Sequence, residues 1–400
     1  MSTYQNTQYQ AVDGYMNVPQ DNKAQNRKSK LIVIGSIIGV VVLIAVGVGV
    51  GVSVAKNHKN TSAKSAAVSN SNSSGSVTQT DPNDPSTFVK NPALHQSFYG
   101  IAYTPFGSQL PDCGNSLAGV ITDIQLLSQL TKRIRLYGAD CNQSALVLEA
   151  IKQTKVDMTV FLGNYPVPSD GGAAYVRQRD LIKNALQTYG ADHVAGVTVG
   201  NEFILDYLGD NGGTTQDPNG PVGNAGAALL LPNITDTISM ISGLGLNIPV
   251  GNADAGSYFN TEILSAVSYG MANVHPWFAA EAIEDAAGWT ADFFATTNVA
   301  AANALSNKPT MYIAETGWPT KSSSVAAQSD GPSLASVENL QIYLDTFVCQ
   351  ANQNGTGYFY FEYYDEQWKD VEFGGVEGWW GLFNSDTTLK NITIPDCPAP

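Results

Sequence analysis

Two glutamates stand where a carboxylate could do chemistry. Glu202 lies in "VGNEF", and Glu315 follows the apolar run of "MYIAETGWPT". Hydrolysis of a glycosidic bond requires a pair of carboxyl groups, one protonated and one ionised. A gap of about 5 to 5.5 Å between them would imply retention of configuration, and about 6.5 to 9.5 Å would imply inversion. A lone glutamate at a strand end is equally often a surface or salt-bridged residue, so the fold must bring both together.

The segments that carry these glutamates alternate between strand-like and helix-like patterns. Amphipathic runs such as 117–132, 178–190 and 336–352 predict helices, because their apolar residues recur at spacings of three and four. Short runs rich in β-branched and aromatic residues predict eight strands, at 97–106, 133–138, 158–165, 194–202, 248–254, 272–277, 311–318 and 357–366. Regular alternation implies parallel strands joined by right-handed crossovers. The predicted fold is therefore α/β, a (β/α)8 TIM barrel.

Active sites of this fold lie at the carboxyl ends of the strands. The polar residues expected at those ends are Asn201, Glu202, Asp254, His275, Glu315, Glu362, Asp365 and Glu366. Glu202 and Glu315 belong to strands three apart, so they could face each other across the mouth of the barrel. This arrangement favours a catalytic pair over two unrelated strand ends.

Longer motifs around both glutamates resemble glycoside hydrolase family 17, the β-1,3-glucanases. "MYIAETGWPT" followed by Lys321 and Ser322 resembles the family signature, and "TVGNE" resembles its acid/base strand. "RLYGADCNQ", "FEYYDEQWK" and "WWGLFN" are similar to its fungal branch, and the motifs occur in the expected order from residue 98 to residue 384. The resemblance implies that Glu202 is the general acid/base and Glu315 the nucleophile, with retention through a covalent glycosyl-enzyme.

The resemblance also implies residues that bind substrate near this pair. Asn201 is similar to an asparagine that contacts the sugar 2-hydroxyl. His275, in "NVHPW", stands where the family has a tyrosine or histidine, and its imidazole could hold the nucleophile by a hydrogen bond.

Four further positions fall inside the matched motifs. Glu366 and Lys369 match charged residues that shape the acidic cleft of the family, although a surface ion pair at i and i+3 is the alternative. Tyr137 and Trp380 are candidate rings for stacking on glucose, with ordinary core packing as the alternative.

The leading hypothesis is an endo-acting, retaining β-1,3-glucan hydrolase of cell-wall remodelling. A β-1,3-glucanosyltransferase would use the same residues, so transfer stays open. A catalytically silent glucan-binding wall protein on the same scaffold is a second alternative, and a related enzyme acting on cellulose or mannan is a third. The chain has 20 basic and 35 acidic residues and a net charge of −15, which argues against nucleic acid as a partner. The oligomeric state is not predicted.

The N-terminal part predicts a membrane anchor. Residues 31–55 carry no charge, and at about 1.5 Å per residue this run is long enough to cross a bilayer as a helix. We assign 1–30 to a cytoplasmic tail, 31–55 to an uncleaved signal anchor, 56–95 to a Ser/Asn-rich disordered stalk and 96–400 to the catalytic domain.

Basic residues flank the predicted span on both sides, so flanking charge does not decide its orientation in the membrane. We infer the orientation from the residues that follow the span. All four cysteines follow it, as do the Asn-x-Ser/Thr sequons at Asn60, Asn72, Asn142, Asn233, Asn354 and Asn391. We therefore expect a single-pass type II plasma-membrane protein with an extracellular catalytic domain, found in the cell wall or secreted if it is shed.

The cysteines predict disulfides and not a metal site. The chain has no CxxC and no HExxH motif, and we expect neither a metal nor another cofactor. Cys113 and Cys141 lie in the loops after the first two predicted strands, whereas Cys349 and Cys397 lie in the last helix and the tail. We predict these two pairs, although three connectivities are formally open.

Overall fold

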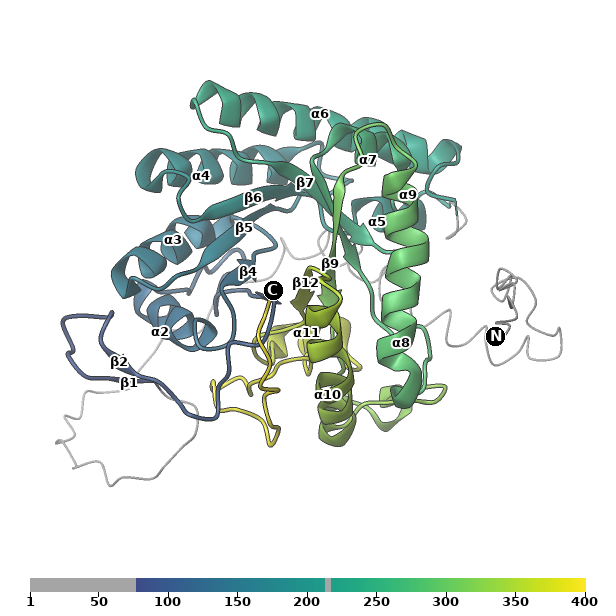
Figure 1. Ribbon diagram of the computed structural model, residues 1–400. Coiled ribbons are helices and arrows are strands. Elements are labelled where there is room, and N and C mark those ends of the chain that lie inside the picture. The colour runs from purple at the N-terminus through teal and green to yellow at the C-terminus, as the bar shows by residue number, and fades with distance from the viewer. Residues whose placement is uncertain (1–76, 213–216) are drawn as a thin grey trace, which may run out of the picture. The chain divides into compact units, whose positions relative to one another are not determined.

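The computed structural model describes residues 77–212 and 217–400 (Figure 1). Within these residues eight parallel strands close into a barrel, in the order β12-β3-β4-β5-β6-β7-β8-β9. They are β3 (Gly100–Ala102), β4 (Arg133–Arg135), β5 (Thr159–Asn164), β6 (Val194–Val199), β7 (Val250–Ala255), β8 (Tyr269–Asn273), β9 (Thr310–Thr316) and β12 (Tyr358–Tyr360). The predicted TIM barrel is confirmed.

Helices follow the strands and surround the barrel (Figure 1). The α-helices are α2 (Leu117–Leu127), α3 (Gln143–Thr154), α4 (Ala173–Tyr189), α5 (Phe203–Asp210), α6 (Pro221–Gly243), α7 (Thr261–Ala266), α8 (Ile283–Phe293), α9 (Ala300–Asn303), α10 (Val337–Gln353) and α11 (Gln367–Phe373). The turns η2 (Asp140–Asn142) and η4 (Val325–Ala327) are 3-10 helical, and the π-helical η3 (Phe294–Val299) joins α8 to α9. Two antiparallel pairs complete the described elements, β1 (Thr78–Gln79) with β2 (Phe88–Val89) and β10 (Ser329–Asp330) with β11 (Ser333–Leu334).

Helix α10 illustrates how the sequence pattern produces this outer layer. Ser336 precedes it and its side chain accepts the backbone N–H of Asn339, which caps the first turn. Leu340, Leu344 and Phe347 recur at spacings of four and three and are buried against the barrel. Predicted helix 336–352 thus agrees with the structure within one residue at each end.

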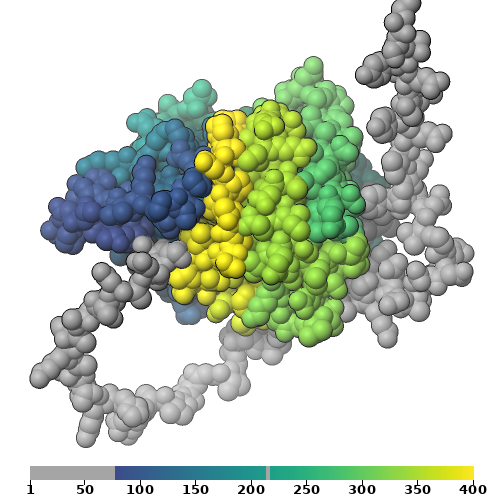
Figure 2. Space-filling view, turned by 60° about the horizontal axis from the view of Figure 1, so that its bottom comes forward, coloured from purple at the N-terminus to yellow at the C-terminus, as the bar shows by residue number. Residues whose placement is uncertain are grey.

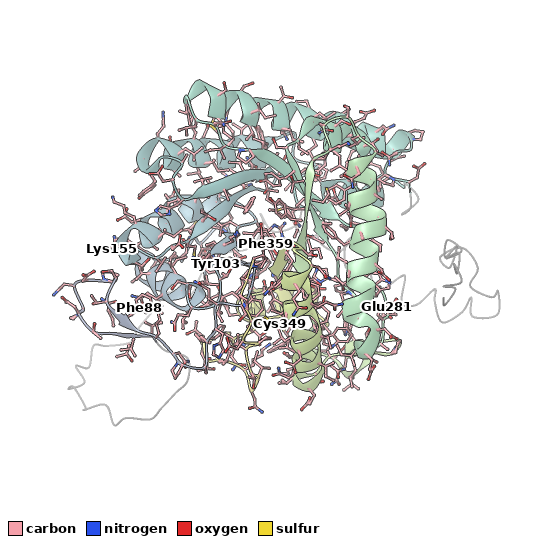
Figure 3. All side chains as sticks on the ribbon, viewed as in Figure 1. Phe88, Tyr103, Lys155, Glu281, Cys349 and Phe359 are labelled. Carbon is pink, nitrogen blue, oxygen red and sulfur yellow. A yellow bond between two sulfur atoms is a disulfide. The ribbon has the colours of Figure 1, made fainter. Side chains whose placement is uncertain are left out.

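Side chains fill the inside of the barrel. The buried residues of this inner cluster are Phe161, Ala253, Tyr269, Met271, Ala314 and Phe359. Phe359, labelled in Figure 3, packs edge-on against Phe161 with ring centroids 5.4 Å apart. A Cβ on Gly251 would lie 2.1 Å from the ring of Tyr269, so β7 needs a glycine at the point where the ring crosses it. The packed rings form a floor beneath the polar residues at the mouth.

The predicted strands differ from the structure in their bounds, most of all the first, the sixth and the eighth. The first, predicted at 97–106, is regular only over Gly100–Ala102. The sixth, predicted at 272–277, is Tyr269–Asn273, so His275 lies in the loop after the strand and not at its end. The apolar run "SYGMANVHPW" does not itself mark where the ladder stops, because tertiary pairing with β9 sets that point. The eighth, predicted at 357–366, is regular only over Tyr358–Tyr360, so Glu362, Asp365 and Glu366 lie after the strand.

The structure also differs from the predicted stalk over residues 77–95. This range contains the β1-β2 pair and is attached to α2, since the Gln125 side chain donates to the Pro85 carbonyl at 2.7 Å and the Asn91 N–H donates to Gln129 at 2.7 Å. Leu94 is buried in the core. Polar composition suggested disorder, but these contacts with a neighbouring helix hold the backbone.

Both predicted disulfides are present, Cys113–Cys141 and Cys349–Cys397. The second joins the C-terminal tail to α10. Figure 2 shows this tail in yellow, between the light green segment that includes α10 and the blue N-terminal part of the described chain. On the blue side, the Ser97 hydroxyl donates to the Pro395 carbonyl at 2.5 Å.

No helix within residues 77–212 and 217–400 is long and apolar enough to cross a membrane. The predicted tail 1–30, the predicted span 31–55 and positions 56–76 of the predicted stalk lie outside the described residues.

Candidate active site

Glu315 lies inside the barrel mouth because strand β9 contains an irregularity just before it. Ala272 of β8 pairs with Ile313, yet the next residue, Asn273, pairs with Glu315, so Ala314 is an extra residue. Ala314 packs in the inner cluster, and simple alternation would turn Glu315 outward toward the helices. A bulge of this kind re-aims the side chain that follows it. The carboxylate consequently faces β4 across the barrel and is only 6% exposed.

Two groups hold the Glu315 carboxylate. Arg135, from β4, donates from Nη1 to Oε1 at 2.9 Å, and His275 Nε2 lies 3.1 Å from Oε2. The hydrogen bond expected between His275 and Glu315 is thus present. Burial opposes ionisation of Glu315, but the His275 hydrogen bond and the Arg135 charge outweigh it and lower its pKa to about 2. Glu315 is therefore ionised at neutral pH.

Glu202 is held in the opposite protonation state. It follows β6, and Asn273 donates from Nδ2 to its Oε1 at 3.0 Å. Burial, and next the negative charge of Glu315, raise the pKa of Glu202 to about 7, despite that hydrogen bond. Two carboxyl groups whose environments push their pKa values apart can serve as a proton donor and an ionised partner.

Asn201, which follows β6, is hydrogen-bonded to residues of β4 and β8. Its Oδ1 accepts from Arg135 Nη2 at 2.6 Å and more weakly from Asn273 Nδ2 at 3.4 Å. Because both donors face the carbonyl oxygen, the amide NH2 is directed away from them. That Asn201 contacts the sugar 2-hydroxyl stays a prediction of the resemblance.

Glu366 and Lys369 form the predicted i, i+3 pair, but the pair is buried and not on the surface. Lys369 Nζ contacts Glu366 Oε2, and it also contacts Glu362 Oε2 at 2.6 Å. Burial and the Glu366 charge raise the pKa of Glu362 well above its usual range. Lys369 also lies 4.5 Å from the ring of Phe361, next to the His275 ring. The cluster supports the wall of the site.

The two predicted stacking rings differ in their surroundings. Tyr137 is half-buried, with the Arg135 guanidinium 4.4 Å above its ring. Trp380 is 0% exposed and packs 5.0 Å from the His275 ring, so its faces are covered by protein and it cannot stack on a sugar in this conformation. Phe278, 46% exposed and 5.6 Å from Trp380, is the ring that remains accessible there.

Sequence reasoning missed several residues of the site. Arg135 stands in "RIRLYG", where a second charge two positions after Arg133 in an apolar strand signals an inward-facing guanidinium. Asn273 was inside a predicted strand, with nothing to mark it as the partner of Glu202. Glu377 is another, because burial raises its pKa while Lys369 and other charges of the site act on it.

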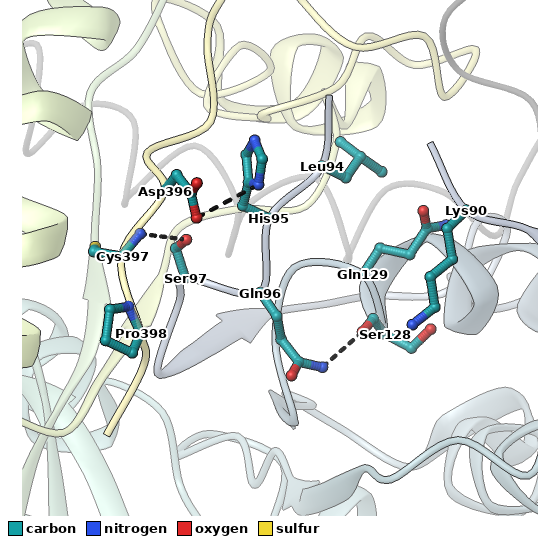
Figure 4. A pocket seen from close by; sticks show the side chains of 10 residues that line it. All are labelled: Lys90, Leu94, His95, Gln96, Ser97, Ser128, Gln129, Asp396, Cys397 and Pro398. Atoms are coloured by element: carbon teal, nitrogen blue, oxygen red, sulfur yellow. Dashed lines mark hydrogen bonds and ion pairs between the residues drawn. The ribbon is translucent and has the colours of Figure 1, made fainter. Parts of the chain in front are cut away.

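A hollow elsewhere on the surface does not belong to this site. It is lined by Lys90, Leu94, His95, Gln96, Ser97, Ser128, Gln129, Asp396, Cys397 and Pro398 (Figure 4). These residues precede β3 and β4 or belong to the tail, so the hollow is at the amino ends of the strands, opposite the carboxylates. Its contacts, such as His95 with Asp396 at 3.6 Å, hold the tail.

No group of three histidine, cysteine, aspartate or glutamate side chains within residues 77–212 and 217–400 could hold a metal ion. The site is instead composed of carboxyl groups, one guanidinium from Arg135, an imidazole and amides. Carboxyl groups held in two different protonation states can protonate a leaving oxygen and attack carbon.

Comparisons with known proteins agree with this geometry. Residues 100–381 match the model of the BtgE/BtgC glycoside hydrolase domain. The probable glucan endo-1,3-beta-glucosidase btgC of Aspergillus terreus is 32% identical over 339 residues, which cover 79% of this chain and 48% of that protein. The glucan endo-1,3-beta-glucosidase btgC of Emericella nidulans is 32% identical over 325 residues, 76% of this chain and 47% of that protein. The chain thus spans about half the length of the curated relatives it matches.

Solved structures share the barrel. A glycoside hydrolase family 17 beta-1,3-glucanosyltransferase from Rhizomucor miehei is 26% identical, has a TM-score of 0.59, and the match covers 75% of this chain and 98% of that one. An active-site mutant of it was solved with laminaritriose. An endo-laminarinase from Formosa has a TM-score of 0.58 at 16% identity, over 76% of this chain and 92% of that one, and shows the shared fold.

Proposed function

Because the chain belongs to the BtgE/BtgC glycoside hydrolases of family 17, we propose that it is a retaining, endo-acting glycosidase that cleaves β-1,3-glucan during cell-wall remodelling. The relatives named above are glucan endo-1,3-beta-glucosidases, and the Rhizomucor miehei enzyme binds laminaritriose in its mutant form. The activities of these relatives support β-1,3-glucan as the substrate of this chain.

The observation that carries the proposal is the opposed electrostatics of the two glutamates. Arg135 and His275 hold Glu315 ionised. Burial and the charge of Glu315 instead raise the pKa of Glu202 to about 7, which favours its protonated form. A binding protein has no need for a buried anion beside a partly buried acid. A retaining glycosidase needs both.

Catalysis proceeds in two steps. In the first, Glu202 gives its proton to the glycosidic oxygen while a Glu315 oxygen attacks the anomeric carbon, so the C–O bond to the leaving glucan breaks and a glycosyl ester forms. In the second, the Glu202 carboxylate takes the proton of an incoming hydroxyl, whose oxygen displaces Glu315 from the anomeric carbon. Arg135 and His275 bind the Glu315 carboxylate, so they orient its oxygens before attack and receive it when the ester is broken.

The direct experiment is product analysis by proton NMR on laminari-oligosaccharides. We expect the first-formed reducing end to be the β-anomer, with mutarotation to the α-anomer following later. An initial α-anomer would mean inversion and would remove Glu315 from the nucleophile role.

The acceptor in the second step decides between hydrolysis and transfer. Transfer is the second candidate, favoured by the 26% identity to a glucanosyltransferase whose chain is matched over 98% of its length. Incubation with laminari-oligosaccharides separates the two, since transfer gives products longer than the donor and hydrolysis gives only shorter ones. The third possibility, a silent glucan-binding protein, predicts binding without any change in chain length.

We also propose that residues 31–55 anchor the enzyme in the plasma membrane with residues 96–400 outside. The uncharged run of 25 residues and the disulfides of the catalytic domain support this topology. The test is alkaline-carbonate extraction of membranes from cells that express the full chain, followed by protease treatment of intact cells. Release by carbonate, or protection of the catalytic domain in intact cells, would contradict it.

A further inference from the structure

The acid/base residue occupies an unusual place in the chain. Glu202 is the N-cap residue of α5, which begins at Phe203. A residue at this position normally uses its side chain to accept the first free N–H groups of the helix. The Glu202 side chain makes no such bond and accepts from Asn273 instead. The cap of α5 must therefore come from elsewhere.

Asp254, at the end of the neighbouring strand β7, supplies it. Its Oδ2 accepts the N–H of Ile204 at 2.9 Å and its Oδ1 accepts that of Leu205 at 3.4 Å, both in the first turn of α5. Oδ1 also accepts the N–H of Ala255 at 2.9 Å, which fixes the carboxyl on its own strand. The side chain is 0% exposed, so water does not compete for these bonds.

The backbone of Glu202 requires such support. Its φ of 56° and ψ of 29° lie in the left-handed region, which costs free energy for a residue with a Cβ and persists only where the surroundings impose it. Strand β7 accepts hydrogen bonds from the backbone N–H groups of Glu202 and of the residues that follow it. The Ala253 carbonyl accepts the Glu202 N–H at 3.2 Å, and Asp254 holds the two N–H groups that come soon after.

We propose that Asp254 is a positioning residue for the general acid: by capping α5 from β7 it imposes the left-handed turn that aims Glu202 at the leaving oxygen, and it leaves the Glu202 carboxyl free for proton transfer. The inference rests on the proposed function, because it assigns Asp254 to the acid step of that reaction. Asp254 thus acts on Glu202, whereas Arg135 and His275 act on Glu315.

The test compares two substrates that differ in their need for an acid. Laminari-oligosaccharides have a poor leaving group that must be protonated, whereas a 2,4-dinitrophenyl β-laminarioside has a leaving group that departs without help. For Asp254→Asn and Asp254→Ala we expect kcat/KM on the oligosaccharide to fall roughly 10- to 100-fold, since general acid catalysis contributes about 10²- to 10⁴-fold. On the dinitrophenyl substrate we expect a change of less than about threefold, because that step bypasses the acid.

The ratio of the two kcat/KM values does not depend on how much of a variant is folded, so partial unfolding leaves the test intact. Asp123→Asn is the matched control, since Asp123 is a buried aspartate that accepts the hydroxyls of Tyr103 and Tyr363 away from Glu202. It should keep the wild-type ratio. Equal losses on both substrates for the Asp254 variants would overturn the proposal and leave Asp254 with a merely structural role.

A double-mutant cycle completes the experiment. In a Glu202→Ala background, Asp254→Asn should lower the oligosaccharide kcat/KM by less than about twofold further, because its effect passes through Glu202. Multiplicative losses would overturn the inference while leaving the proposed function intact. If Glu202→Ala alone leaves the oligosaccharide activity unchanged, the proposed function itself fails, which is a distinguishable result.

Discussion

Replacing Arg135 by methionine removes the guanidinium that holds the nucleophile. In the structure this group donates to Glu315 at 2.9 Å and to Asn201 at 2.6 Å from inside the barrel. Methionine fills a similar volume with no charge, so the perturbation is chiefly electrostatic. The His275 contact with Glu315 stays in place.

The expected magnitude follows from the bond between Arg135 and Glu315. A hydrogen bond to a charged group contributes about 1.5 to 3 kcal/mol. Loss of the bond to Glu315 alone would lower kcat/KM by roughly 10- to 150-fold, at about 1.4 kcal/mol for each factor of ten. The same energy corresponds to a rise of about one to two in the pKa of Glu315. From its present value of about 2 the pKa would move to between about 3 and 4.

The assay is the pH dependence of kcat/KM on laminari-oligosaccharides between pH 2.5 and 9, with folding checked by circular dichroism at each pH. We expect the acidic limb of Arg135→Met to move upward relative to the wild type, since Glu315 must be ionised to attack. The basic limb should change little, because it reports Glu202.

Arg133→Met is the matched control. Arg133 is two residues earlier on the same strand and loses the same charge, but its guanidinium lies 4.3 Å over the Tyr99 ring and donates to the Pro400 carbonyl at 3.1 Å. It should keep the wild-type acidic limb. A folded Arg135→Met enzyme with an unshifted acidic limb and kcat/KM within about threefold of wild type would refute the role assigned to Arg135.

Three further predictions concern the acid/base and the disulfide of the tail. In the wild type, kcat/KM should fall as the pH rises through about 7, because Glu202 must be protonated to act as an acid; a rate constant to pH 9 would contradict this. Burial raises the pKa of Glu202 from 4.5 to about 7 in the folded protein. The free energy of unfolding is therefore unaffected by Glu202 below pH 4.5, where the residue is neutral in both states, and it decreases as the pH rises from 4.5 through 7. Glu202→Gln should therefore be more stable than wild type at pH 8, by up to about 3 kcal/mol, and equally stable at pH 4, as measured by denaturant unfolding; the opposite trend would show that Glu202 is not desolvated. The double variant Cys349→Ala/Cys397→Ala opens a link between residues separated by 48 positions, so it should lose about 4 kcal/mol of unfolding free energy, and an unchanged Tm would show that the link contributes nothing.

The barrel was predictable because its signal is repeated along the chain. Each strand-helix unit carries its own apolar periodicity, so an error at one strand end, such as that at Tyr269–Asn273, leaves the topology unchanged. Glu202 and Glu315 were predictable because each stands at a strand end within a distinctive motif. The hydrogen bond from His275 to Glu315 followed from the same motifs.

Other features depend on contacts that one stretch of sequence does not contain. The bulge at Ala314 turns Glu315 inward, and it arises from pairing with β8 and not from the residues "IAET" alone. The aromatic motif around Trp380 suggested a sugar-binding ring, but neighbouring side chains cover that ring. The exposed Phe278 directly follows "NVHPW", a motif that had pointed only to His275. Asp254 was recognised as a strand-end residue, yet its bonds to α5 became visible only once β6 and β7 were adjacent.

The central claim is that Glu315 forms a covalent bond to the glucan. A 2,4-dinitrophenyl laminarioside with fluorine at the 2-position of the reacting sugar should form the glycosyl ester with the enzyme. The fluorine slows breakdown of this ester, so the labelled enzyme accumulates. Mass spectrometry of proteolytic peptides then locates the label. We predict one fluoroglycosyl group per enzyme, carried by the peptide that contains Glu315, and none on the Glu315→Gln variant. Labelling of a different residue, or turnover of the reagent without any labelled enzyme and with inverted product, would contradict the account.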